Sequence, residues 1–303
     1  MGPQQCSSTP QTLTLDSAPY SNYFYTDCNT QVQVVVTTPQ PDSDLTAIGP
    51  RLIFGWPAGN SGSCLFFAPQ NGVNGTLAIE MVNSTNPDFP LSLNYTAGTP
   101  NPGVGVQGTL RFNSSAVLAL PIMGSIRTIR DFTEGPSILQ PQIQDAINYI
   151  SLPDGSVMLE RLWLDNVTMS TVKFTPANSS AQATLSNTTV SFDAGDYVVS
   201  AEITYPQLTQ LLPPAVLNNA SYGLATTEPT QTLGLSFLST TEKLLAGGWR
   251  FLTYFGRDTM IATLLLEPVM SYGAGGAVEA VLGAVCERIN STDGSVCHEE
   301  TIG

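Results

Sequence analysis

The sequence contains little charge, and most of that charge is negative. Charged residues make up 11% of the 303 residues, with ten Lys plus Arg, 24 Asp plus Glu, one His and a net charge of −14. Binding to nucleic acid or to anionic lipid needs clustered cations that neutralise phosphates. Arg127 and Arg130 come nearest to a cluster, so we expect neither nucleic acid nor membrane among the partners.

Long apolar runs are also scarce. The longest run near a predicted helix, 260–270, contains Glu267 and has about half the length that a bilayer requires. We therefore expect no transmembrane segment. The first residues, Met1–Cys6, contain no apolar core of the kind found in signal peptides.

Cysteine and histidine are too few for the common metal sites. The five cysteines include no CxxC pair and there is one His, so we expect no metal. In an oxidising compartment Cys286 and Cys297 could form a disulfide across the loop between them, and two of Cys6, Cys28 and Cys64 could form another.

Acceptors for N-glycosylation are abundant. An Asn-x-Ser/Thr motif, the acceptor for N-linked glycans, predicts a protein of the secretory pathway whose signal peptide is missing from this sequence. A Ser/Thr-rich chain that is never glycosylated is the alternative. The nine acceptors are Asn74, Asn83, Asn94, Asn113, Asn166, Asn178, Asn187, Asn219 and Asn290.

Residues 1–212 are predicted to form an antiparallel β-sandwich domain. Turn signals such as Asn71-Gly72 and Pro153-Asp154-Gly155 separate runs in which apolar and polar residues alternate. The segment 138–150 is predicted to be a short helix or an irregular crossover. The alternating runs are 31–36, 76–81, 104–112, 157–164, 184–192 and 197–205.

The spacing of apolar residues becomes helical after Pro213-Pro214. We predict a linker helix within 213–247, ended by Gly247-Gly248, and two further helices at 258–270 and 277–289. Three helices with apolar faces cannot enclose a core by themselves, so we expect 248–303 to be the truncated start of a helical domain.

One polar and aromatic cluster lies just before the predicted helix at 258–270. Trp249, Tyr254 and Phe255 precede the pair Arg257-Asp258. Carbohydrate sites combine aromatic faces, which stack on sugar rings, with paired charged groups that exchange hydrogen bonds with hydroxyls. These five residues are therefore candidate substrate ligands. The alternative is a helix-capping ion pair beside core aromatics, and the sequence leaves both open.

A second cluster is His298-Glu299-Glu300. Glycoside hydrolysis generally needs two carboxyl groups, which makes Glu299 and Glu300 candidate catalytic residues and His298 a candidate substrate ligand. Adjacent side chains normally diverge, so the two glutamates are not expected to act as partners. A solvated acidic loop is the alternative interpretation.

The segment 244–266 (LLAGGWRFLTYFGRDTMIATLLL), together with the later HEETIG, resembles the start of the catalytic domain of six-hairpin glycosidases. It is similar to the Phe-Gly-Arg-Asp-Thr segment of the glycogen-debranching and amylo-α-1,6-glucosidase-like branch. The resemblance, which covers 244–303, implies an (α/α)6 barrel preceded by a β-sandwich and a linker helix. It also implies that Arg257 and Asp258 bind the sugar at the −1 subsite, with His298, Glu299 and Glu300 at the barrel mouth.

The expected architecture is therefore mainly β with a helical C-terminal part: an antiparallel β-sandwich, a linker helix and the first helices of an incomplete (α/α)6 barrel. The expected function is a glycoside hydrolase that acts on α-glucan-type sugars by acid/base catalysis, with a carbohydrate partner and no cofactor. This chain is expected to be inactive alone. The alternative is a non-catalytic secreted glycan-binding or surface glycoprotein built on the sandwich. The sequence leaves the oligomeric state undetermined.

Overall fold

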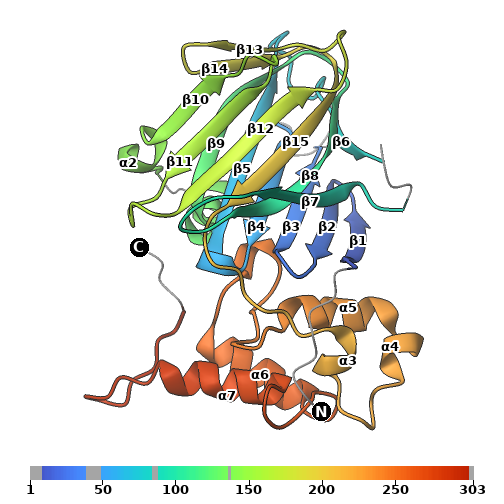
Figure 1. The fold of residues 1–303 in the computed structure, drawn as a ribbon, viewed down its shortest axis with the longest axis vertical. Helices are drawn as coiled ribbons and strands as arrows, with labels where there is room; N and C mark the ends of the chain where they lie inside the picture. The colour runs from blue at the N-terminus through green and yellow to red at the C-terminus, as the bar shows by residue number, and fades with distance from the viewer. Residues whose placement is uncertain (1–8, 39–48, 84–87, 136–137, 300–303) are drawn as a thin grey trace.

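The computed structural model describes residues 9–38, 49–83, 88–135 and 138–299. Its described part is mainly antiparallel β and contains two sheets, with most of the helices gathered at one end of them (Figure 1). The prediction of a mainly β protein with a smaller helical C-terminal part is confirmed.

The first sheet has eight strands among the described residues, all paired antiparallel. A hairpin of two short strands extends it at one edge. Its strand order is β1 (Gln11–Ser17), β2 (Tyr20–Thr26), β3 (Gln31–Thr37), β4 (Arg51–Trp56), β5 (Ser61–Pro69), β9 (Ala116–Ser125), β14 (Thr189–Phe192) and β13 (Ala183–Ser186).

The second sheet has seven described strands and is also antiparallel. Two strands share one edge of β8, because β6 pairs with its last residues and β7 with its first. The order is β10 (Ile147–Ser151), β11 (Val157–Leu162), β12 (Met169–Pro176), β15 (Gly195–Ile203), β8 (Gly103–Phe112) and β6 (Ile79–Val82), with β7 (Leu91–Thr96) beside β8.

The main core lies between the two sheets. In β15 the residues Tyr197, Val199, Ala201 and Ile203 are buried and alternate with more exposed ones, as the period-two pattern predicts. They join residues from both sheets in one continuous apolar cluster. Its centre is aromatic, with ring centroids 4.9–6.3 Å apart among Phe67, Phe112, Phe174, Phe192 and Tyr197.

Seven α-helices are present in the described ranges, and two short 3-10 turns accompany them. None of the described helices has the length and apolar character needed to cross a bilayer. The helices are α1 (Ile126–Glu134), α2 (Pro141–Gln144), α3 (Pro213–Val216), α4 (Leu224–Thr227), α5 (Pro229–Leu238), α6 (Gly256–Leu266) and α7 (Ala277–Glu287), and the turns are η2 (Ala58–Asn60) and η3 (Trp249–Phe251).

The outer face of the first sheet is covered by helical elements. Val35, Ile53 and Cys64 face outward from the sheet and pack against α1, α5 and η3 in a second apolar cluster. This cover explains why all of β3 is buried. The alternation in 31–36 predicts polar side chains on a solvent face, but Gln31 and Gln33 are 2% and 3% exposed because the helical part lies over them.

The helical part has a third cluster of its own. Leu211, Val216, Leu244, Met270 and Val281 pack together there. The predicted helices at 258–270 and 277–289 correspond to α6 and α7, each of which ends a few residues earlier than predicted. Asp258 lies in the first turn of α6, as predicted.

Two local predictions differ from the structure. The single linker helix is replaced by α3, α4 and α5, and α5 ends at Leu238 because Ser239 bridges Leu244 and its carbonyl accepts from the Leu211 amide. The run 184–192 is a hairpin of β13 and β14, because Asn187 adopts a left-handed φ of 55°. The segment 138–150 contains both α2 and the start of β10.

The cysteines divide into bonded and free residues. Cys28 takes part in a disulfide, whereas Cys64 is a free thiol whose burial raises its pKa to about 12. The possible disulfide between Cys286 and Cys297 is not formed, and both are free and exposed. The reason is position: Cys286 lies in the last turn of α7, whereas the Cys297 carbonyl lies against Gly256 at the start of α6. Cys6 is outside the described residues.

Candidate functional site

The structure brings the two clusters singled out in the sequence together. Phe255 and Glu299 form an isolated antiparallel bridge, and the Gly256 amide donates to the His298 carbonyl at 3.0 Å. The rings of Phe255 and His298 meet edge to face, with centroids 5.6 Å apart. The start of α6 and the loop that carries His298 and Glu299 therefore form one structural unit. Glu300 lies outside the described residues.

The aromatic side chains of the first cluster are part of the core. Tyr254 is fully buried, Trp249 is 6% exposed and Phe255 is 8% exposed. Trp249 packs on the outer face of the first sheet, and the Arg288 guanidinium lies over the Tyr254 ring at 4.4 Å. Rings buried in this way have no free face for a sugar, so the geometry favours the alternative of core aromatics over the predicted stacking role.

Arg257 and Asp258 are accessible, in contrast to the aromatics. Their side chains are 70% and 49% exposed, and Arg257 Nη2 lies 3.6 Å from Asp258 Oδ2. Both lie in the first turn of α6, where the helix dipole favours a carboxylate. The pair is therefore available to a ligand, but an exposed pair at this separation contributes little to folding stability.

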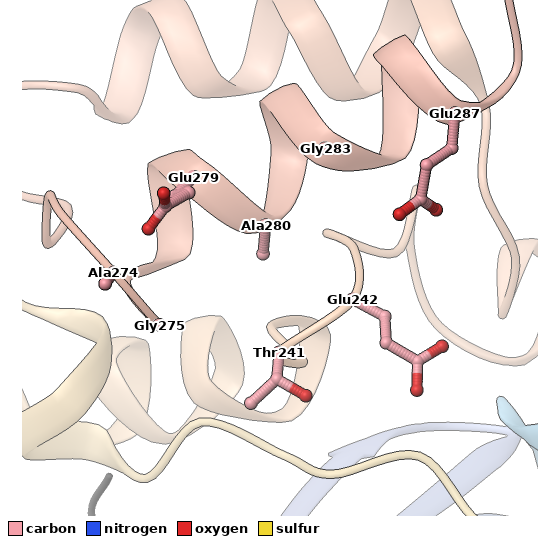
Figure 2. A pocket seen from close by; sticks show the side chains of 8 residues that line it. All are labelled: Thr241, Glu242, Ala274, Gly275, Glu279, Ala280, Gly283 and Glu287. Carbon is pink, nitrogen blue, oxygen red and sulfur yellow. The ribbon is translucent and has the colours of Figure 1, made fainter. Parts of the chain in front are cut away.

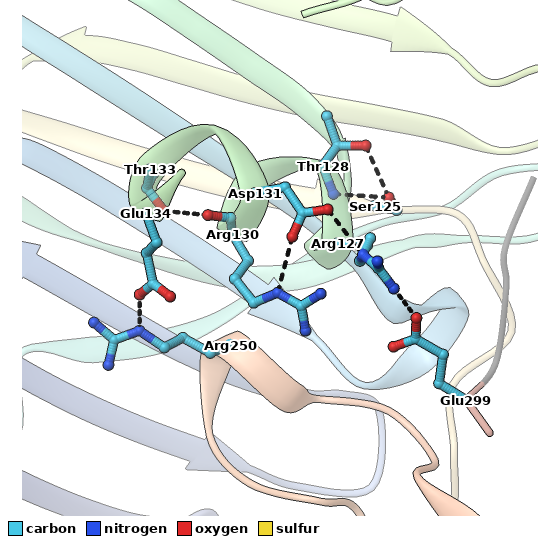
Figure 3. Close-up of polar contacts among 9 residues, drawn as sticks. All are labelled: Ser125, Arg127, Thr128, Arg130, Asp131, Thr133, Glu134, Arg250 and Glu299. Atoms are coloured by element: carbon cyan, nitrogen blue, oxygen red, sulfur yellow. Dashed lines mark hydrogen bonds and ion pairs between the residues drawn. The ribbon is translucent and has the colours of Figure 1, made fainter. Parts of the chain in front are cut away.

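Helix α1 connects the sandwich to this unit (Figure 3). It begins where β9 ends, and its N-cap Ser125 accepts a hydrogen bond from the Thr128 amide at 3.2 Å. Arg127 forms an ion pair with Glu299, and Glu134 forms one with Arg250 next to Trp249. A helix that the sequence analysis did not predict thus holds both candidate segments.

A carboxylate within α1 organises the arginines. Asp131 accepts from Arg127 Nε at 2.8 Å and from Arg130 Nε at 3.1 Å. Burial raises the pKa of Asp131, but the hydrogen bonds and charges of these two arginines outweigh it and hold the pKa below its ordinary value. Asp131 therefore remains ionised and fixes Arg127 in the direction of Glu299.

A cavity of about 570 Å³ lies where the sandwich meets the helical part. Two carboxylates, Glu242 and Glu299, reach it from different loops, and Lys243 and Arg288 accompany them. Its residues do not include Arg257 or Asp258. The sandwich and the segment that follows it supply the rest of the lining: Pro57, Gly59, Asn60, Tyr205, Pro206, Gln207 and Leu208, with Cys297 beside Glu299.

Glu242 was not predicted as a site residue, because its position falls within the predicted linker helix. In the structure a tight turn follows α5, in which the Thr240 hydroxyl accepts hydrogen bonds from the amides of Glu242 and Lys243 at 3.2 and 3.0 Å. Hydrogen bonds from backbone amides to a side-chain hydroxyl compete with continuation of the helix. The run Ser239-Thr240-Thr241 is the local signal that could have indicated a turn.

Glu242 also lines a second cavity, of about 330 Å³, beside α7 (Figure 2). Glu279 and Glu287 of α7 line it as well, and the small residues Gly275, Ala280 and Gly283 leave the space open. Within the described ranges no three Cys, His, Asp or Glu side chains are close enough together to hold a metal ion. This second cavity is therefore an acidic recess next to the main one.

The predicted glycosylation acceptors lie mostly on the surface. Eight of the nine Asn residues are exposed, and Asn94 is partly buried. The Asn94 side-chain amide donates to Glu202 at 2.9 Å. The exposed acceptors are thus accessible to the glycosylation machinery, as surface sequons must be.

No family model matches this chain, and neither the curated proteins nor the solved structures contain a match to it.

Proposed function

We propose that this protein is a glycoside hydrolase that acts on α-glucan-type sugars by acid/base catalysis. The observation that supports it best is that Glu242 and Glu299, from separate loops, line one cavity of about 570 Å³. Glycoside hydrolysis needs two carboxyl groups that face the same bond. Two glutamates on different loops can do so, whereas the adjacent pair Glu299-Glu300 cannot readily converge.

The two carboxyl groups have different surroundings. Glu299 is paired with the Arg127 guanidinium and its side chain is 15% exposed. It is therefore assigned the role of the carboxylate that stays ionised during the reaction. Glu242 is assigned the proton donor. The glycosidic C–O bond breaks as the leaving oxygen takes a proton, and water adds its hydroxyl to the anomeric carbon while its remaining proton restores the donor. Residue chemistry alone suffices, with no cofactor.

The accessible pair Arg257-Asp258 is proposed to bind hydroxyls of the same carbohydrate outside the cavity, and His298 to support the loop that carries Glu299. We further propose that α6 and α7 begin a larger (α/α)6 barrel. The exposure of Leu264 and Leu265 on α6, 75% and 76%, supports a face that further helices cover. Catalysis would then require the complete barrel.

The proposed setting is the secretory pathway. The exposed acceptors and the disulfide at Cys28 support it, because disulfides persist in oxidising compartments. A carbohydrate is the proposed partner.

The test is hydrolysis of α-1,4- and α-1,6-linked glucose oligosaccharides by the full translated product. Glu242→Gln and Glu299→Gln should each lower kcat/KM about 100-fold or more, and Asp258→Asn should also lower it strongly. Glu279→Gln, which alters only the second cavity, should change it by no more than a few fold. Full activity in both the Glu242 and Glu299 variants would refute the assignment.

A non-catalytic glycan-binding protein is the second candidate, favoured by the sandwich residues Asn60 and Tyr205 in the cavity lining. It predicts binding of the same oligosaccharides with no hydrolysis by any form of the protein.

A further inference from the structure

The turn that joins β11 to β12 carries an exposed apolar surface. Leu164 and Val167 lie in this turn with exposed fractions of 65% and 51%, and Leu162, the last residue of β11, is 42% exposed. Exposed apolar side chains are ordinary when they are scattered singly, but these are gathered in one turn and form a small patch. Covering the patch would therefore stabilise the protein, because it removes apolar surface from water.

Hydrogen bonds fix the backbone of this turn. The Trp163 amide donates to the Thr168 carbonyl at 2.8 Å, and the Asn166 amide donates to the Trp163 carbonyl at 2.9 Å. The Asp165 carboxylate accepts hydrogen bonds from the amides of Val167 and Thr168 at 3.0 and 2.9 Å. Because the turn is closed in this way, its exposed side chains are presented on a well-defined backbone.

An acceptor for an N-linked glycan, Asn166, lies within the patch. Asn166 is exposed and has a left-handed φ of 56°, a conformation that asparagine adopts more readily than most residues. Its Nδ2, the atom to which a glycan is attached, lies 3.4 Å from the Leu164 carbonyl oxygen. A sugar joined to Nδ2 therefore begins beside Leu164, and Val167 is the next residue in the chain.

The chemistry of a glycan suits such a surface. A pyranose ring presents C–H groups on its faces and hydroxyl groups at its rim, so it can cover apolar side chains while its hydroxyls remain in water. The covalent bond to the asparagine also removes most of the translational and rotational cost of association. A patch too small to bind a free sugar can therefore hold one that is attached beside it.

A second acceptor provides a contrast within the same chain. Asn187, in the β13–β14 turn, is also exposed and has almost the same φ, 55°. Leu185, two residues before it, packs against the main core, whereas Leu164, two residues before Asn166, is exposed. A threonine follows Asn187 where a valine follows Asn166. A glycan on Asn187 thus begins in more polar surroundings.

We propose that Asn166 carries an N-linked glycan whose first sugars pack on Leu164 and Val167 and hold the β11–β12 turn closed. The glycan would then be part of the folded structure as well as a solubilising attachment. The inference rests on the proposed secretory setting and goes beyond the proposed hydrolysis, since no described residue of this turn lines the 570 Å³ cavity.

The test measures hydrogen exchange by mass spectrometry on the full chain secreted by a eukaryotic host. Asn166→Gly and Asn187→Gly each remove one acceptor and keep a residue that tolerates positive φ. We expect Asn166→Gly to speed exchange of the amides in 163–169 about threefold or more, because local opening of the turn becomes easier. Asn187→Gly is the matched control and should leave those amides unchanged.

A third variant separates the glycan from the asparagine side chain. Leu164→Ser removes most of the apolar surface on which the sugar is proposed to pack. It should speed exchange in 163–169 when Asn166 is glycosylated. In the Asn166→Gly background, where no sugar covers Leu164, the same substitution should have little effect. The difference between the two backgrounds measures the contact between sugar and side chain.

Equal exchange in wild type and Asn166→Gly would overturn the proposal, as would an effect of Leu164→Ser that is the same in both backgrounds. An unmodified Asn166 beside glycans at other acceptors would also overturn it, and self-association reduced by Leu164→Ser would then assign the patch to a second copy of the chain. The absence of glycans at every acceptor would refute the secretory setting as well. Hydrolysis of oligosaccharides is a separate measurement, and its presence or absence leaves the exchange results unchanged.

Discussion

The guanidinium of Arg127 forms an ion pair with the carboxylate of Glu299, and this contact joins the helix after β9 to the last described loop of the chain. The Arg127 side chain is 52% exposed, so solvent screens the pair. The contact therefore directs Glu299 more than it stabilises the fold, while the backbone pairing of Phe255 with Glu299 holds the loop.

A double-mutant cycle tests this division. Arg127→Met, Glu299→Gln and the double variant should give a coupling energy below about 1 kcal/mol in urea unfolding, as is usual for exposed pairs. Lys173→Met removes a similar contact to Asp154 on the sandwich surface and is the control for an exposed ion pair. It should also change the free energy of unfolding by less than about 1 kcal/mol. A coupling energy above about 2 kcal/mol would show that the pair is effectively buried.

Two carboxylates on β15 should give opposite pH dependences. Burial raises the pKa of Glu202, which the Thr96 hydroxyl only partly offsets. A raised pKa in the folded state contributes stability at low pH that is lost as the pH rises through that value. Glu202→Gln should therefore melt above the wild type at pH 7, and this advantage should disappear below its ordinary pKa of 4.5.

Asp196 provides the contrast. Arg111 donates to it from Nε at 2.7 Å and Nη2 at 3.0 Å, and these hydrogen bonds hold its pKa below the ordinary value of 3.8. Its contribution is present above that value and is lost as the pH falls through the lowered pKa. Asp196→Asn should therefore melt below the wild type at neutral pH and match it in acid. Melting curves from about pH 2 to pH 8 decide both cases, and parallel curves for all three proteins would contradict them.

Two glycine substitutions should change stability in opposite directions. A Cβ at Gly105 would lie 1.9 Å from the Ala201 carbonyl oxygen on the neighbouring strand, whereas a Cβ at Gly234 meets nothing within 4 Å. Gly105→Ala should cost about 3 kcal/mol. Gly234→Ala, inside α5, should add about 0.5–1 kcal/mol because alanine loses less backbone entropy in a helix. Urea midpoints measure both, and a neutral Gly105→Ala would show that β8 can move away from β15.

The apolar face of α6 should make this chain prone to self-association. Leu264 and Leu265 are 75% and 76% exposed, and exposed apolar patches of this kind promote association. The double substitution to Gln should lower the binding of a hydrophobic dye and raise solubility. Ile138→Gln, at an exposed position between α1 and α2, should do neither. A soluble monomer that melts cooperatively and binds no dye would contradict this expectation.

Expression in a secreting eukaryotic host tests the glycosylation acceptors. We expect glycans at exposed acceptors such as Asn166 and Asn187, which project from turns with positive φ. We expect low occupancy at Asn94, whose amide is already bonded to Glu202. Peptide mass spectrometry after enzymatic deglycosylation in heavy-oxygen water locates each glycan. An unmodified secreted product would support the alternative of a Ser/Thr-rich chain that is not glycosylated.

The local sequence pattern was sufficient to predict strands that pack one face against the core. In 197–205 apolar and polar residues alternate, and β15 follows that pattern from Gly195 to Ile203 because one of its faces meets the core. The helices α6 and α7 were also predictable from apolar spacing. Helix α1 was not, because its short amphipathic run lies directly after β9 and gives no break in the pattern.

The mainly β class, the low charge, the acceptors for glycans and the two clusters around Arg257 and Glu299 could all be read from the amino-acid sequence. These features depend on composition and on neighbours a few residues apart. Three features emerged only in the folded protein: Trp249 and Tyr254 are buried, Glu242 shares a cavity with Glu299, and Asn60 lines that cavity. The reason is physical: burial and cavity lining arise from contacts between residues far apart in the chain, and periodicity within one segment carries no information about which surface will cover it.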